Sequence, residues 1–118
     1  MDMMETMEQI WQEVKRKKPV IECITNTVTI GDCANIILAA GASPIMAEDI
    51  REVEEIVAIS GAVVLNIGTL QEDTVRAMHQ AGQAANRLGV PVVLDPVGVG
   101  ASRLRNETAE SLLREVQF

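Results

Sequence analysis

The sequence predicts an α/β fold with a mostly parallel sheet and flanking helices, and two observations lead to this prediction. Short apolar runs of strand length alternate along the chain with longer segments of helical periodicity. Several of the short runs end at small polar residues or glycine, as is typical where the carboxyl ends of strands meet a ligand. Strands and helices that alternate in this way form a parallel sheet with right-handed crossovers.

An amphipathic helix is expected at the start of the chain, before the first strand. Its apolar residues recur at helical spacing between polar ones: Met4, Met7, Ile10, Trp11 and Val14. The basic cluster Lys15–Lys18 and Pro19 close this helix. The cluster is interpreted as a solvated helix end favoured by the helix dipole, with an anion contact as the alternative.

Four β-α units are expected after this helix. The apolar runs predict strands over residues 20–24, 43–46, 62–66 and 90–94. The periodic segments between them predict helices over residues 28–40, 50–60 and 72–88, with Gly41 and Gly89 ending the first and the last of these. Asn106 is expected to cap a final helix, whose buried face would hold Ala109, Leu112, Leu113 and Val116.

Composition limits the classes of function that the chain can serve. The 118 residues suffice for one modest domain, and 47% of them are hydrophobic while only 2% are aromatic. A net charge of -7 and the absence of an aromatic series argue against a nucleic-acid partner. No apolar run is long enough to span a bilayer, and the acidic start does not resemble a secretory signal. We therefore expect a cytoplasmic protein without a membrane partner, with Cys23 and Cys33 as reduced thiols.

The segment Val90–Ala101 is the most informative part of the sequence. An apolar run, predicted to be a strand buried on both faces, stops at Asp95, and a proline and two glycines follow. The glycines do not complete a dinucleotide fingerprint, because Arg103 stands where the third glycine belongs, and no Walker A sequence is present. The segment indicates a ligand-binding edge with a charge able to meet a metal or a hydroxyl group. A plain turn capped by the aspartate is the alternative.

Two other strand ends carry small polar residues. Thr25 and Asn26 follow the first strand, and could bind a neutral heterocycle or form an Asx turn or helix cap. Gly68, after the third strand, would let a ligand approach the backbone, although a simple turn explains it as well. Met46, at the end of the second strand, is more typical of core packing by its residue type, and His79 has no partner at metal-ligand spacing.

Several blocks, in this order, resemble the hydroxyethylthiazole kinase family from about Pro19 to the end of the chain. The residues that carry the resemblance are CITN at 23–26, DCAN at 32–35, GASPIMA at 41–47, VLNIGT at 64–69 and LDPVGVGA at 94–101. The resemblance implies a ribokinase-like fold and the ATP- and Mg²⁺-dependent phosphorylation of 4-methyl-5-(2-hydroxyethyl)thiazole in thiamine salvage.

The resemblance also assigns roles to individual residues. Met46 matches the methionine that contacts the thiazole, and Asn26 and Gly68 match positions that line the same pocket. Asp95 matches the aspartate on the magnesium and phosphate side. The family forms homotrimers with substrate pockets at subunit interfaces, so a homotrimer is implied for a complete chain.

Two departures from the family pattern affect what is expected. Glu22 stands where many members have histidine, next to the site. Residues 1–118 are expected to be the N-terminal part of a single ribokinase-like kinase domain, truncated after the fourth β-α unit, with a leading helix over 1–18 and β-α repeats over 19–118. No catalytic base is then expected within this chain, which alone would be inactive. The alternative is a non-enzymatic assembly or binding module derived from such a kinase.

Overall fold

The computed structural model describes residues 1–118 and contains five helices and four strands that alternate after the first helix. The helices are α1 (Met3–Lys17), α2 (Ile30–Ala39), α3 (Val53–Ala58), α4 (Glu72–Leu88) and α5 (Arg103–Glu115). The strands are β1 (Val20–Ile24), β2 (Ser43–Ile45), β3 (Ala62–Asn66) and β4 (Val92–Asp95).

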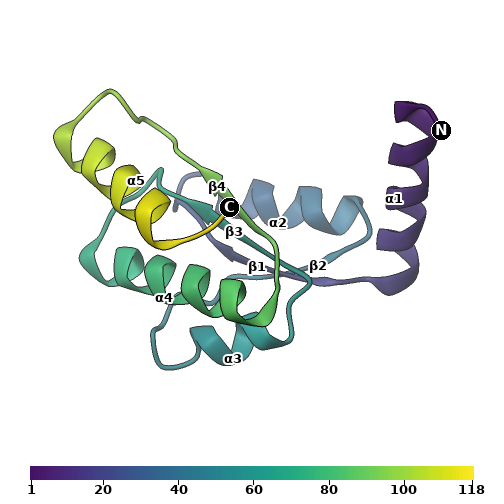
Figure 1. The fold of residues 1–118 in the computed structure, drawn as a ribbon, viewed down its shortest axis with the longest axis horizontal. Helices are drawn as coiled ribbons and strands as arrows, with labels where there is room; N and C mark the ends of the chain where they lie inside the picture. The colour runs from purple at the N-terminus through teal and green to yellow at the C-terminus, as the bar shows by residue number, and fades with distance from the viewer.

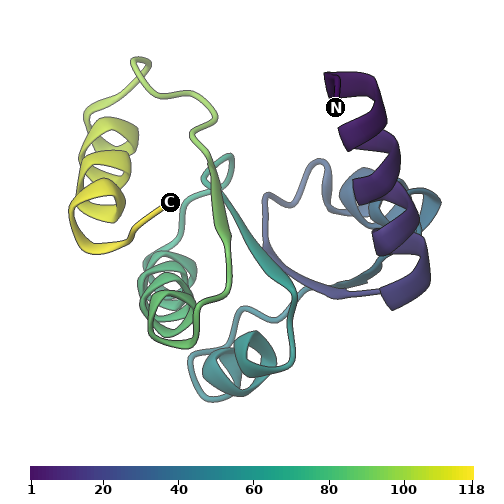
Figure 2. The same cartoon turned by 45° about the vertical axis from the view of Figure 1, so that its right-hand side comes forward.

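The four strands form one parallel sheet in the order β2-β1-β3-β4, so β1 and β3 are central and β2 and β4 lie at the edges. Helix α2 lies on one face of the sheet, and α3 and α4 lie on the other, where α5 packs beside α4 (Figures 1 and 2). The predicted parallel α/β architecture is therefore confirmed. Because all strands run the same way, their carboxyl ends meet at one edge.

The hydrophobic core lies between the sheet and α3, α4 and α5, and it is aliphatic. Its largest fully buried members include Ile24, Leu65, Ile67, Met78 and Leu112. A stripe of small residues on α4, including Ala77, Ala81 and Ala85, lets this helix pack closely on the strands. The absence of buried aromatic side chains agrees with the composition.

Local chemistry explains where several helices begin and end. Asp2 and Glu5 form a reciprocal capping box at the start of α1. Gly89 ends α4 with a φ of 72°, a left-handed conformation that glycine adopts without strain. Ser102 caps α5 by accepting a hydrogen bond from the Arg105 amide, so Asn106 lies inside the helix and the predicted cap was wrong. Ser102 precedes three residues of good helix formers, which makes the helix begin one turn earlier.

Three further expectations need correction. The helices predicted over 28–40 and 50–60 are shorter, because turns occupy residues 27–29 and 50–52. Leu113 on α5 is 61% exposed while its neighbour Leu112 is fully buried, so this helix buries a narrower face than expected. Strand β4 is not buried on both faces: Val92 packs in the core, whereas Val93, on the opposite face of the sheet, is 55% exposed.

Two helices of this chain carry apolar surface that the described residues do not cover. Neither α1 nor α2 contains a buried residue. Helix α1 projects from the rest of the molecule, and its apolar stripe, which includes Met7, Ile10 and Trp11, is exposed (Figures 1 and 2). None of the helices is long and apolar enough to cross a lipid bilayer.

Candidate functional site

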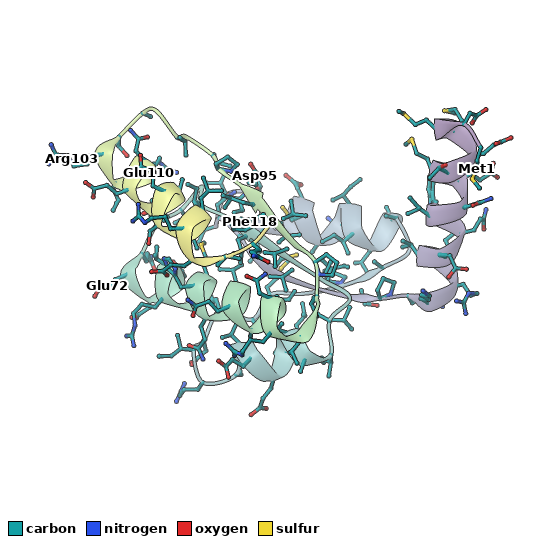
Figure 3. The ribbon with its side chains drawn as sticks, in the orientation of Figure 1. Met1, Glu72, Asp95, Arg103, Glu110 and Phe118 are labelled. Carbon is teal, nitrogen blue, oxygen red and sulfur yellow. The ribbon has the colours of Figure 1, made fainter.

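The four candidate residues lie at the carboxyl ends of the four strands, one at each end. Met46 follows β2, Asn26 lies two residues after β1, Gly68 lies two residues after β3, and Asp95 is the last residue of β4. The strands are parallel and adjacent in register, so these positions share the carboxyl edge of the sheet. Asp95 lies far from the free end of α1, which Met1 marks in Figure 3.

A chain of side-chain hydrogen bonds joins three of these strand ends. Asn66 lies beside Asp95 in the β3–β4 register, and its Nδ2 donates to Asp95 Oδ2 at 3.1 Å. Asn66 Oδ1 accepts from Asn26 Nδ2 at 3.0 Å and from the Gly68 amide at 2.8 Å. Asn26 and Asn66 are both buried, so these amide groups are held by one another rather than by water.

The carbonyl oxygen of Asn26 has a local structural task. Asn26 Oδ1 accepts from the Val28 amide at 3.0 Å, the Thr29 amide at 2.9 Å and Thr29 Oγ1 at 3.0 Å. These bonds form the Asx-type turn that leads into α2. The Asx turn expected as an alternative is therefore present. The Nδ2 group of Asn26 takes no part in this turn and donates instead to Asn66 at the end of the neighbouring strand.

Gly68 allows the two asparagines to approach the β3–α4 turn closely. A Cβ atom at this position would lie 2.8 Å from Asn26 Nδ2 and 2.9 Å from Asn66 Oδ1. Since both side chains are committed to hydrogen bonds, neither can move away without breaking one. The requirement for glycine here is steric, because no side chain fits between the two amides.

Arg105 braces the same turn from α5. Its Nη1 donates to the carbonyl oxygens of Ile67 at 2.6 Å and Val97 at 2.9 Å, and its Nη2 donates to that of Gly68 at 3.0 Å. The guanidinium group thus ties the loop after β3 to the loop after β4. It fixes the position of Gly68 relative to Asp95.

Asp95 is the exposed end of the hydrogen-bonded chain. Only its Oδ2 atom takes part in the contact with Asn66, which leaves Oδ1 free of side-chain donors. No group of three or more His, Cys, Asp or Glu side chains in the chain could hold a metal ion. Mg²⁺ is commonly bound through only one or two carboxylates together with substrate phosphates and water, so a single exposed aspartate fits that mode of binding.

Met46 lies after the edge strand β2, separated from Asp95 by the two central strands. Its side chain is half-buried and takes no part in the polar chain. The neighbouring amide, that of Ala47, donates to Oε1 of the fully buried Glu22 at 3.0 Å. The turn that carries Met46 is therefore attached to the central strand β1.

The remaining reactive side chains have structural surroundings. Cys23 is buried, and burial raises the pKa of its thiol to about 11, so the thiol stays protonated near neutrality. Cys33 is also free, as expected for reduced thiols, and is half-buried. His79 is partly buried, as expected, and its two ring nitrogens lie next to Glu115 and Ser111 of α5.

Two contributors to the site were not singled out from the sequence. Asn66 was quoted within a sequence motif but was not proposed as a site residue. The signal that could have found it is its position as the last residue of a central strand, paired with Asp95 on the neighbouring strand. Arg105 gave no such signal, because it contacts carbonyl groups 37 and 38 residues away in sequence. Only the packing of α5 beside α4 brings it there.

The fold and these strand ends define a parallel α/β protein with a hydrogen-bonded cluster of polar side chains, the candidate site, at the carboxyl edge of its sheet. Comparison with known proteins then gives the family. Residues 11–118 match the model of the Hydroxyethylthiazole kinase family, so the chain belongs to this family.

Individual relatives agree with this assignment. The chain is 59% identical over 115 residues to the hydroxyethylthiazole kinase of Desulfovibrio desulfuricans and 58% identical over 106 residues to that of Clostridium tetani. These matches cover 98% and 90% of this chain but only 40% and 39% of the relatives. A solved hydroxyethylthiazole kinase from Pyrococcus horikoshii OT3 superposes with a TM-score of 0.91 at 40% identity, over 94% of this chain and 44% of that one. The chain therefore spans about 40% of the length of the curated relatives it matches.

Proposed function

We propose that this chain provides the thiazole-side half of a kinase that phosphorylates 4-methyl-5-(2-hydroxyethyl)thiazole with ATP, as part of thiamine salvage. The observation that supports this proposal most is the polar chain from Asn26 through Asn66 to Asp95 at the carboxyl edge of the sheet. It lies in a chain that belongs to the hydroxyethylthiazole kinase family.

In this proposal, residues at three of the strand ends bind the thiazole and a residue at the fourth binds Mg²⁺. Met46, Asn26 and Gly68 line the thiazole. Asp95 would hold Mg²⁺ through its exposed carboxylate. The metal ion would neutralise charge on the phosphoryl group during transfer. Asn66 holds Asp95 at 3.1 Å and so orients the carboxylate toward the ligand side.

The catalytic base and most of the ATP contacts belong, in this proposal, to polypeptide outside the 118 residues. The two halves together would exclude water and place the substrate hydroxyl group in line with the γ-phosphate. Because a kinase needs ATP as a co-substrate, we propose that the protein is located in the cytoplasm, where ATP is abundant.

We further propose assembly as a homotrimer in the complete protein. The exposed apolar stripe of α1 and the lack of buried residues in α2 support an assembled state, because large exposed apolar surface marks interaction sites. Light scattering coupled to size-exclusion chromatography would measure the mass. A monodisperse monomer of the complete protein would contradict the trimer.

A chimera tests the proposed function. The matching segment of the Desulfovibrio desulfuricans relative would be replaced by this chain, to which it is 59% identical. We expect thiazole-dependent conversion of ATP to ADP, with formation of the phosphorylated thiazole alcohol. A folded chimera without turnover, beside an active unmodified relative, would contradict the proposal.

A further inference from the structure

Glu22 is an unusual residue in the core of this protein. It lies in the middle of the central strand β1, between Ile45 of β2 and Val63 of β3, and its side chain is 0% exposed. Its Oε1 atom accepts the hydrogen bond from the Ala47 amide, whereas Oε2 is buried and has no partner. An ionised carboxylate in such a place bears an uncompensated desolvation cost.

The surroundings of Glu22 favour a proton on its carboxyl group. The charged groups that act on it are the carboxylates of Glu52 and Glu48, on the β2–α3 segment, and the Cys23 thiol is its neighbour on β1. None of these groups is a cation. Burial is the largest effect, and together with the weaker repulsion from Glu52 and Glu48 it outweighs the opposite effect of the Ala47 and Cys23 backbone amides and raises the pKa of Glu22 to about 7.

The turn that Glu22 contacts has few other anchors. Met46, Ala47 and Glu48 take part in no backbone–backbone hydrogen bond outside the helices and strands. Further along, the turn is held by Asp49, which accepts from the Arg51 amide at 2.8 Å, and by Gln80, which donates to the Ile50 carbonyl at 3.1 Å. The bond between Glu22 and Ala47 is therefore the contact that fixes the backbone next to Met46.

We propose that Glu22 is a positioning residue whose buried carboxyl group sets the place of Met46 through the Ala47 amide, more firmly when it is ionised than when it carries a proton. The physical reason is that a hydrogen bond to a carboxylate is about twice as strong as one to a neutral acceptor. That Met46 faces the substrate rests on the proposed function. The coupling of Glu22 to Met46 rests on the contacts above.

Nuclear magnetic resonance of the 118-residue chain tests this coupling without a ligand. The Ala47 amide and the Met46 amide and methyl signals would be followed from pH 5 to pH 9. We expect both residues to titrate together with a midpoint near pH 7. The titration should vanish in Glu22→Gln and persist in Glu55→Gln, which removes an exposed acid from α3.

Three results would overturn the inference. One is an Ala47 midpoint near the ordinary glutamate value of 4.5. Another is an unchanged titration in Glu22→Gln, which would assign it to a different group. The third is a titration of the Ala47 amide signal during which no Met46 signal shifts, since the ionisation of Glu22 would then not affect Met46. None of these results depends on substrate binding. The proposed function is tested separately, by the activity of the chimera.

Discussion

At the residue scale, the carboxyl edge of the sheet is organised by the amide group of Asn66. This one side chain contacts Asn26, the Gly68 amide and Asp95, which belong to three different strand ends. A primary amide can donate and accept at the same time, whereas a carboxylate in its place could only accept. Asn66 therefore aligns the uncharged part of the site with its single charged residue.

Gly68→Ala tests the close packing around these amides. The added methyl group would lie within 3 Å of Asn26 and Asn66 side-chain atoms. We expect a loss of about 1–3 kcal/mol in the free energy of unfolding, measured by urea denaturation. Gly31→Ala is the matched control, because nothing lies within 4 Å of its Cβ position in α2, and it should be neutral or stabilising by up to about 1 kcal/mol. Equal effects of the two substitutions would contradict the steric role of Gly68.

The raised pKa of Glu22 predicts how stability depends on pH. The folded protein binds the Glu22 proton more tightly than the unfolded chain, so this contribution is fully present below pH 4.5 and is lost as the pH rises to about 7. Glu22→Gln mimics the protonated form. It should match the original chain near pH 4 and exceed it by about 3 kcal/mol at pH 8.

Urea denaturation of the variant and the original chain at both pH values measures this difference in the free energy of unfolding. The difference in the free energy of unfolding between Glu55→Gln and the original chain should be the same at both pH values. A Glu22→Gln variant that is less stable than the original chain at pH 8 would show that the ionised carboxylate stabilises the fold, contrary to the account given above.

At the scale of elements, α5 stabilises the site from outside the sheet. It packs on α4 through Leu112 and Val116, and it sends Arg105 to carbonyl groups of the two loops that flank Asp95. Gly98 has a φ of 78°, and a Cβ there would lie 2.8 Å from Arg105 Cδ. The glycine-rich loop after β4 is thus shaped around the arginine side chain.

Arg105→Lys tests this brace, because lysine keeps the charge and loses the planar fork that reaches three carbonyl groups. We expect a loss of about 1–3 kcal/mol in the free energy of unfolding. Arg103→Lys, whose side chain is 89% exposed, should change it little. A thermal or urea unfolding series in which both variants behave alike would rule out the brace.

The sequence allowed the strands, their direction and the long helix α4 to be predicted, because apolar runs and helical periodicity are local signals. It also placed Asn26, Asp95 and Gly68 at strand ends. The contacts of Arg105 could not be predicted, since they depend on how α5 packs. The burial of Glu22 was also hidden, because an acid within an apolar strand gives no sign of which face it occupies until the neighbouring strands are known.

At the scale of the whole molecule, this chain carries the proposed thiazole side of the site on a well-packed sheet. Its core is closed on the α3–α4 face, while α1, α2 and Val93 leave apolar surface exposed. The relatives that it matches are about two and a half times as long, since it covers 40% of the Desulfovibrio desulfuricans kinase. The exposed surfaces are consistent with contacts to further polypeptide in such a protein.

The 118-residue chain alone should not phosphorylate the thiazole alcohol, because the proposed base and most ATP contacts lie outside it. A coupled assay for ADP would measure this at saturating ATP, Mg²⁺ and thiazole alcohol. Turnover near the rate of the full-length Desulfovibrio desulfuricans relative would contradict this division of the site.

Phosphorylation of the thiazole alcohol by the chimera, with and without Asp95→Asn, tests the central claim most directly. Asparagine keeps a side-chain oxygen for Asn66 and removes the charge proposed to bind Mg²⁺. We predict a fall in kcat/KM of roughly 100-fold or more for Asp95→Asn, since a charge that stabilises the transferred phosphoryl group is lost. Glu110→Gln, which removes one exposed negative charge from α5, should leave kcat/KM unchanged. An Asp95→Asn chimera as active as its parent would show that the carboxyl edge of this sheet is not the metal and phosphate side of the site.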